Sequence, residues 1–234
     1  MPISENLAAV RDRIDKAARG SERSLEEIAL MAVSKTQPAE RIREAYSAGQ
    51  RLFGENRVQE FSGKIDALRD LRDAEWHMIG HLQTNKTAKT AELFRAVDSV
   101  DSLKLAEKLD ASARALGRKL DVLIEINVGG EAAKSGVAPD SAALDELLMA
   151  APRLEALVFH GLMTVPPFTD DPEAARPYFR KLRELRDTIA TRKLPGVTMD
   201  QLSMGMSHDF EVAIEEGSTC VRVGTAIFGE RAKA

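Results

Sequence analysis

The chain has 234 residues, of which 44% are hydrophobic and 30% are charged, a balance that suits a globular protein with a full core. Its formal net charge of −4 and the absence of a basic block argue against nucleic acid as a partner. No apolar run reaches membrane-spanning length, no secretory signal opens the chain, and the single Cys220 excludes an intramolecular disulfide. We therefore expect a cytoplasmic protein in which residues 1–234 form one domain.

The chain opens with a predicted amphipathic helix, because Leu7, Val10, Ile14 and Ala17 recur at helical spacing after Ser4, a suitable N-cap. Strand-like and helix-like segments then alternate to the end of the chain. The eight predicted strands lie near residues 28–34, 51–54, 76–79, 95–98, 120–127, 156–162, 198–203 and 219–223.

This alternation predicts parallel strands joined by right-handed crossovers. Eight strand–helix units in 234 residues come close to the roughly 250 residues of a (β/α)₈ TIM barrel. The competing doubly wound sheet often carries a glycine-rich phosphate fingerprint after its first strand, but Ser34-Lys35-Thr36 stands there instead. We therefore predict a single (β/α)₈ barrel with an extra N-terminal helix.

Lys35 ends the first apolar run, over residues 28–34, and Thr36-Gln37-Pro38 follows it. A run of this length closed by a proline predicts a buried strand that ends and a helix that begins. Lys35 then stands at the carboxyl end of the strand, where parallel α/β folds bind their ligands. A lysine partly withdrawn from water can lose its proton near neutral pH and attack a carbonyl group, although most lysines at strand ends are solvated surface residues.

The loops after the last two predicted strands have the composition of a phosphate site, which barrels often place there. Ser203 and Thr225 offer hydroxyl groups, while Gly205 and Gly224 let backbone N–H groups approach an anion. Ser207 is a candidate N-cap for the helix that follows. The alternative is that all of them are ordinary turn and cap residues.

Several other polar residues fall on predicted strands. Arg222 interrupts an apolar strand, so it needs either a structural ion-pair partner or a ligand. Cys220, on the same strand, is better explained as a small core residue than as a nucleophile. His77 and His81 have the spacing of a helical metal pair, but Gly80 and apolar neighbours predict a strand and turn, so we reject a metal site.

Six segments in chain order together resemble the signature blocks of the pyridoxal phosphate homeostasis protein family. The resemblance spans nearly the whole chain, and the family's fold is similar to the barrel domain of alanine racemase. The segments are residues 31–36 (MAVSKT), 53–60 (FGENRVQE), 77–86 (HMIGHLQTNK), 160–164 (HGLMT), 202–207 (LSMGMS) and 222–229 (RVGTAIFG).

The resemblance implies that Lys35 holds pyridoxal 5'-phosphate (PLP) as a Schiff base and that Arg222 faces the pyridine nitrogen. Arginine can only donate a hydrogen bond there, so the ring nitrogen stays unprotonated and the ring is a poor electron sink. The other cofactor-binding residues that the resemblance implies are Asn56, Ser203, Met204, Gly224 and Thr225.

The function implied by the resemblance is PLP homeostasis: binding, buffering and delivery of the cofactor, which keeps amino-acid and keto-acid pools balanced. Apo forms of PLP-dependent enzymes are candidate partners, and we expect a monomer without an efficient catalytic reaction. One alternative is a weak amino-acid racemase. Racemases of similar fold use a tyrosine from a second domain, whereas the chain ends at Ala234 and places Tyr46 and Tyr178 within predicted helices. Another alternative is a cofactor-free Schiff-base aldolase, which would be colourless.

Overall fold

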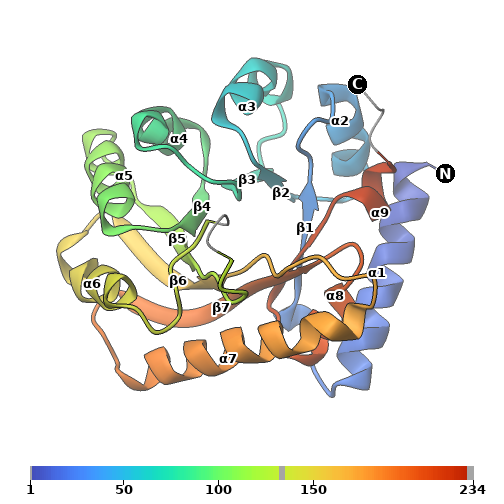
Figure 1. The fold of residues 1–234 in the computed structure, drawn as a ribbon. Coiled ribbons are helices and arrows are strands. Elements are labelled where there is room, and N and C mark those ends of the chain that lie inside the picture. Colours follow the sequence, from blue (N-terminus) through green and yellow to red (C-terminus); the bar gives the residue numbers. More distant parts are fainter. Residues whose placement is uncertain (1, 132–134, 231–234) are drawn as a thin grey trace.

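A computed structural model describes residues 2–131 and 135–230. In this part of the chain, eight parallel strands close into a barrel in sequential order (Figure 1), which confirms the predicted fold. The strands are β1 (Ala29–Val33), β2 (Leu52–Glu55), β3 (Glu75–Met78), β4 (Ala96–Val100), β5 (Leu120–Glu125), β6 (Leu157–Met163), β7 (Val197–Met206) and β8 (Cys220–Val223).

The helices surround the barrel, and the predicted N-terminal helix is present as α1, which packs beside α8 and α9 (Figure 1). Among the described residues, no helix is both long and apolar enough to cross a membrane. The α-helices are α1 (Ile3–Gly20), α2 (Ala39–Ser47), α3 (Val58–Lys64), α4 (Thr87–Leu93), α5 (Leu103–Ala115), α6 (Ala142–Ala150), α7 (Arg176–Thr191), α8 (Phe210–Glu215) and α9 (Thr225–Phe228). Short 3₁₀ helices cover Leu25–Glu27, Ile65–Leu68, Thr84–Lys86, Ala151–Arg153 and Pro172–Ala175.

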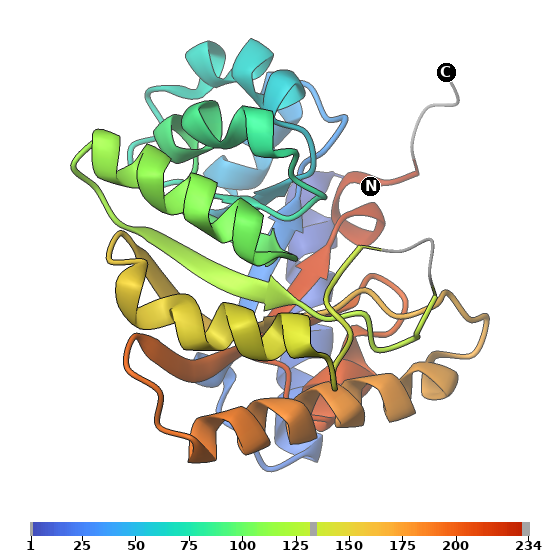
Figure 2. The ribbon, with the colours of Figure 1, turned by 60° about the vertical axis from the view of Figure 1, so that its left-hand side comes forward.

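The barrel closes where β8 pairs with β1, with Met31 opposite Arg222 and Ala32 opposite Val223. Because all strands run in the same direction, their carboxyl ends meet at one rim. Figure 2 shows the loops after β5 and β6 on the same side of the barrel as α9. The closure thus brings the end of β1 next to the final quarter of the chain.

Buried aromatic side chains fasten α3 to the barrel. Phe61 of α3 packs against Trp76 of β3, with ring centroids 4.8 Å apart, and against Phe94 at 4.9 Å. Trp76 in turn stacks on Phe53 of β2 at 4.9 Å. These rings bury a large apolar area, so the position of α3 against β2 and β3 is well defined.

Strand β7 is longer than predicted. The sequence pattern ended it at Ser203, whereas the structure continues it to Met206. The extension passes through Gly205, whose φ of +91° suits glycine. A Cβ atom there would lie 2.5 Å from the Cβ of Ala213 and 2.9 Å from the Cα of Phe210, so this glycine allows α8 to pack closely on β7.

Candidate functional site

A cavity of about 410 Å³ opens at the carboxyl rim of the barrel, a size that suits a small organic ligand. Lys35 comes from the end of β1 and Asn56 from the end of β2. Ser207, Arg222 and Thr225 come from β7, β8 and the residues that follow them. Residues far apart in the sequence therefore meet around one space, which is the arrangement expected if Lys35 and the last two loops share a ligand.

Lys35 lies in the turn that follows β1 and is half-buried at the cavity. The next residue, Thr36, has a φ of +65°, a left-handed conformation that is unfavourable for a β-branched side chain. Such outliers persist only where surrounding contacts hold them, and they are found often at functional sites. The turn that carries Lys35 is therefore a specifically held conformation.

Arg222 is buried at the floor of the cavity, with only 4% of its surface exposed. Its guanidinium donates one hydrogen bond of 2.7 Å to Ser203 Oγ and another of 2.7 Å to the carbonyl oxygen of Thr164. Burial lowers the pKa of this guanidinium, but arginine stays protonated at neutral pH. Both partners are neutral groups, so the structural ion pair considered above is not what holds Arg222 in the described part of the chain.

Backbone amides at the start of α9 converge on a single oxygen atom. The N–H groups of Gly224 and Ala226 both donate to Ser207 Oγ, at 3.2 and 3.4 Å. The predicted cap was wrong: α8 begins after Asp209 and receives no side-chain cap, while Ser207 reaches across to α9 instead. Converging N–H groups of this kind are suited to phosphate oxygens.

Ser203 and Met204, two of the predicted cofactor residues, are fully buried within β7 and do not line the cavity. The Ser203 hydroxyl accepts the hydrogen bond from Arg222, and Met204 packs in the core. Both residues are buried because β7 continues to Met206, so the first residue after the strand is Ser207. Ser207, which stands just before Asp209 and α8, lines the cavity instead.

Asn56 contributes an orphaned polar atom. Its Oδ1 is buried without a hydrogen-bond partner, a state that native structures seldom leave unexplained. Gly80 makes room for it, because a Cβ atom there would lie 2.5 Å from the carbonyl oxygen of Asn56. The cavity thus combines an amine, a fixed guanidinium, an unpaired amide oxygen and converging N–H groups. This donor set fits an aldehyde that carries an aromatic nitrogen ring and a phosphate, so the residues present fit PLP.

Two features at this rim had no clear sequence signal. The loop after β6 brings Val165, Pro167 and Phe168 to the cavity, and the Phe168 ring, 77% exposed, lies 5.8 Å from the ring of His208. Glu125, at the carboxyl end of β5, is buried and its Oε2 has no hydrogen-bond partner. Burial and the nearby Asp101 raise the pKa of Glu125 to about 7, against the opposing effect of Arg222.

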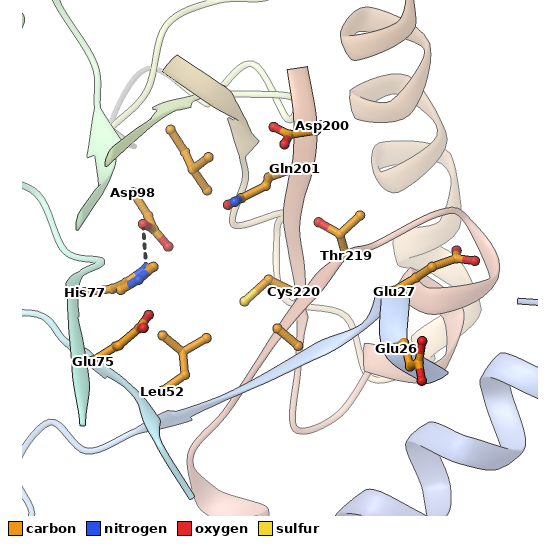
Figure 3. A pocket seen from close by; sticks show the side chains of 12 residues that line it. Glu26, Glu27, Leu52, Glu75, His77, Asp98, Asp200, Gln201, Thr219 and Cys220 are labelled. Atoms are coloured by element: carbon orange, nitrogen blue, oxygen red, sulfur yellow. Dashed lines mark hydrogen bonds and ion pairs between the residues drawn. The ribbon is translucent and has the colours of Figure 1, made fainter. Parts of the chain in front are cut away.

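A second cavity, of about 540 Å³, opens at the amino end of the barrel (Figure 3). Its lining includes the carboxylates of Glu75, Asp98 and Asp200 and, among the described residues, contains no lysine or arginine. Cys220 lies against it, and burial raises the pKa of its thiol to about 12, so this thiol is not a nucleophile at neutral pH. The acidic lining repels a phosphate, so this cavity is unsuited to PLP.

The two histidines once considered as a metal pair bond to different carboxylates. His77 Nδ1 lies 3.0 Å from Asp98 (Figure 3), and His81 Nδ1 lies 3.1 Å from Asp101. Three or more ligands able to hold a metal ion come together nowhere in the described residues.

The chain is similar to known proteins over nearly its whole length. The family model of the alanine racemase N-terminal domain matches residues 6–232. The pyridoxal phosphate homeostasis protein of Aquifex aeolicus is 49% identical and covers 99% of each chain. That of Escherichia coli K12 is 46% identical over 98% of this chain and 97% of its own.

Solved structures show the same fold. PipY of Synechococcus elongatus, solved with PLP bound, is 38% identical, with a TM-score of 0.84 over 97% of this chain and 100% of its own. Alanine racemase of Clostridium difficile, at 16% identity and a TM-score of 0.72, shares the fold over 57% of its own length. The chain therefore belongs to the alanine racemase N-terminal domain family and, within it, to the pyridoxal phosphate homeostasis proteins.

Proposed function

We propose that this protein binds PLP at the carboxyl rim of the barrel, with Lys35 as the covalent attachment point, and that it buffers and passes on the cofactor. The observation that carries the proposal is that Lys35 and Arg222 share one cavity with Ser207, the residue on which the N–H groups of Gly224 and Ala226 converge. The names of the relatives and the PLP-bound PipY structure support the choice of ligand.

Each group in the cavity has a role that its chemistry fits. Lys35 would hold the cofactor through Nζ, an amine that can condense with an aldehyde with loss of water. The N–H groups of Gly224 and Ala226, with the Ser207 and Thr225 hydroxyls, hold the phosphate. When bound, PLP supplies the aldehyde and a ring that can stabilise negative charge. Asn56 lines the same space, and Ser203 supports the site from below by fixing Arg222.

Arg222 favours a carrier over an enzyme. Its hydrogen bonds to Ser203 and Thr164 hold the guanidinium in place, and it has no proton acceptor to offer the ring nitrogen. The ring nitrogen then remains unprotonated, and withdrawal of electrons by the ring is weak. Arg222 therefore suits retention of the cofactor rather than catalysis with it.

Neither tyrosine is placed to act as a racemase base. Tyr46, in α2, bonds to Asp73, and the Arg51 guanidinium stacks 4.0 Å from its ring centroid. Tyr178 lies in α7 on the outside of the barrel. Neither lines the cavity that contains Lys35. The proposal includes a monomer in the cytoplasm that delivers PLP to apo forms of PLP-dependent enzymes.

The test is a titration of the protein with PLP, followed by the yellow absorbance of the imine. We expect the wild type and Lys89→Ala, a control at an exposed lysine of α4, to develop the band. Lys35→Ala loses the band but still binds pyridoxamine 5'-phosphate, which has the ring and phosphate without the aldehyde. A band of full intensity in Lys35→Ala contradicts the assignment. Racemisation of alanine at enzyme-like rates by the wild type contradicts the carrier role.

A further inference from the structure

Lys64, the last residue of α3, lies beneath the turn that carries Lys35. Its side chain is only 11% exposed, which is unusual for a lysine. The aromatic packing of Phe61 holds α3 against the barrel, so Lys64 is presented at a fixed place. It lies outside the lining of the cavity at the rim.

The ammonium group of Lys64 joins both ends of the turn to the barrel. It forms an ion pair of 2.8 Å with Glu55, a fully buried residue of β2. It also donates to the carbonyl oxygens of Ser34 and Gln37, at 3.1 and 3.3 Å, which are the residues on either side of the turn. Its fourth acceptor is Glu60, at 3.3 Å. Ser34 adds a bond of its own, from its Oγ to Glu55 at 2.6 Å.

Glu60 completes the network by binding the unfavourable residue in the middle of the turn. Its carboxylate accepts the backbone N–H of Thr36 at 2.5 Å. Thr36 has the left-handed φ of +65°, so this hydrogen bond and those of Lys64 hold a conformation that the isolated chain would avoid. The network acts on each residue around Lys35 in turn: Ser34, Thr36 and Gln37.

We propose that Lys64, together with Glu55 and Glu60, is a positioning group that fixes the turn so that Lys35 points its amine into the cavity. This inference rests on the proposed function, because it concerns the capture of the PLP aldehyde. It predicts that Lys64 sets the rate and extent of covalent capture, while the ring and phosphate contacts on β8 and α9 set the noncovalent affinity.

The same contacts explain why Lys64 does not compete as the attachment point. An ammonium group has three N–H donors, and Lys64 faces four acceptors, two of them carboxylates. These acceptors occupy the N–H groups of Lys64 and hold its side chain outside the cavity lining. Lys64 therefore serves as a fixed cation in the scaffold, and Lys35 remains the reactive amine.

The test compares Lys64→Met with the wild type in three measurements on the full chain. We expect covalent capture of PLP, read from the yellow band, to fall about tenfold or more, because small displacements of a reacting group are costly. Affinity for pyridoxamine 5'-phosphate should stay within about threefold, since that ligand needs no amine from Lys35. Hydrogen exchange at the Thr36 amide should accelerate, a readout that involves no cofactor.

Two further variants make the result decisive. Glu60→Ala breaks the bond to Thr36 but leaves the buried Glu55–Lys64 pair intact, so it tests the network if Lys64→Met fails to fold. Lys89→Met, at an exposed ion pair within α4, should change none of the three measurements.

The outcomes separate the two proposals. Unchanged capture in both Lys64→Met and Glu60→Ala overturns the positioning role. An equal loss of PLP and pyridoxamine 5'-phosphate affinity also overturns it, since that pattern indicates a general structural effect. If hydrogen exchange at Thr36 were faster in Lys64→Met but the wild type showed no imine band, Lys64 would still position the turn, and the proposed function would be contradicted instead.

Discussion

The two ends of the barrel have opposite chemistry although the same strands build both. The carboxyl rim presents Lys35, Arg222 and converging backbone N–H groups, whereas the amino end presents Glu75 and Asp98. Strand β8 shows the division most directly, because Cys220 lines the amino-end cavity and Arg222, two residues later, lines the rim cavity. Side chains two apart face the same side of a strand, so depth along the barrel decides which ligand a residue can reach.

The largest expected effect comes from a negative charge placed at the rim, where we propose that the phosphate of PLP binds. In Ser207→Asp, a carboxylate would occupy the point where the N–H groups of Gly224 and Ala226 converge. We expect PLP affinity to fall about 100-fold, because like charges brought together cost several kcal/mol. Equilibrium titration with PLP and with pyridoxamine 5'-phosphate measures the effect, and both ligands should weaken alike.

The matched control removes a negative charge at the other end. Glu75→Gln alters the lining of the amino-end cavity and leaves the rim untouched. Its PLP affinity should equal that of the wild type within error. If Glu75→Gln changed the affinity as much as Ser207→Asp, the two ends would not be functionally distinct.

The raised pKa of Glu125, a buried residue at the rim, can be tested through the pH dependence of the free energy of unfolding. Burial and Asp101 raise its pKa from the ordinary 4.5 to about 7, so the folded state keeps a proton that the unfolded state loses. The free energy of unfolding should therefore fall as pH rises from about 4.5 to 7, by roughly 1–3 kcal/mol. Glu125→Gln, which stays neutral, should be more stable than the wild type at about pH 8 by that amount and equal to it below about pH 4.

Urea unfolding of both proteins across this pH range measures the difference. The groups whose charges act on Glu125 are Asp101, Arg222 and His81, and the substitution leaves all of them in place. A constant difference between the two proteins at every pH would show that folding does not raise the pKa of Glu125, contrary to the expectation.

The smallest expected effect lies at the amino end, in the His77–Asp98 pair. Burial lowers the pKa of His77, but the Asp98 carboxylate, 3.0 Å away, outweighs it and the net pKa is raised. A raised histidine pKa gives stability that is present below the ordinary value near 6.5 and is lost as pH rises through the folded value.

The stability that Asp98→Asn loses relative to the wild type should therefore be larger at about pH 6 than at about pH 8, by about 1 kcal/mol. Thermal or urea unfolding at the two pH values measures it, and PLP affinity should be unaffected. A change in PLP affinity without a pH-dependent change in stability would show that the amino end affects binding at the rim, so the two ends would not be functionally distinct.

Much of the fold followed from local sequence patterns. Apolar runs and helical periodicity predicted all eight strands and the N-terminal helix within a few residues, because strands buried in a barrel are continuously apolar. The position of Lys35 at the rim also followed, since it ends such a run. Arg222 interrupts the last strand, and its sequence context left a structural ion pair and a ligand both open.

Other parts of the site depended on information that no local pattern carries. Ser207 was predicted only as a helix cap, because the extra length of β7, which brings Ser207 to the cavity, depends on close packing of Gly205 against α8. The buried position of Glu125 and the contacts of Lys64 arise only when β5, β2 and α3 come together. Their residue types alone would suggest solvated surface positions.

In the proposed function, one amine at the rim, that of Lys35, captures PLP. Borohydride reduction of the PLP-loaded protein fixes the adduct, and mass spectrometry of its peptides identifies the modified lysine. We expect a single phosphopyridoxyl group on Lys35 and an unmodified Lys64. An adduct found mainly on Lys64, or spread over surface lysines such as Lys89, would contradict it.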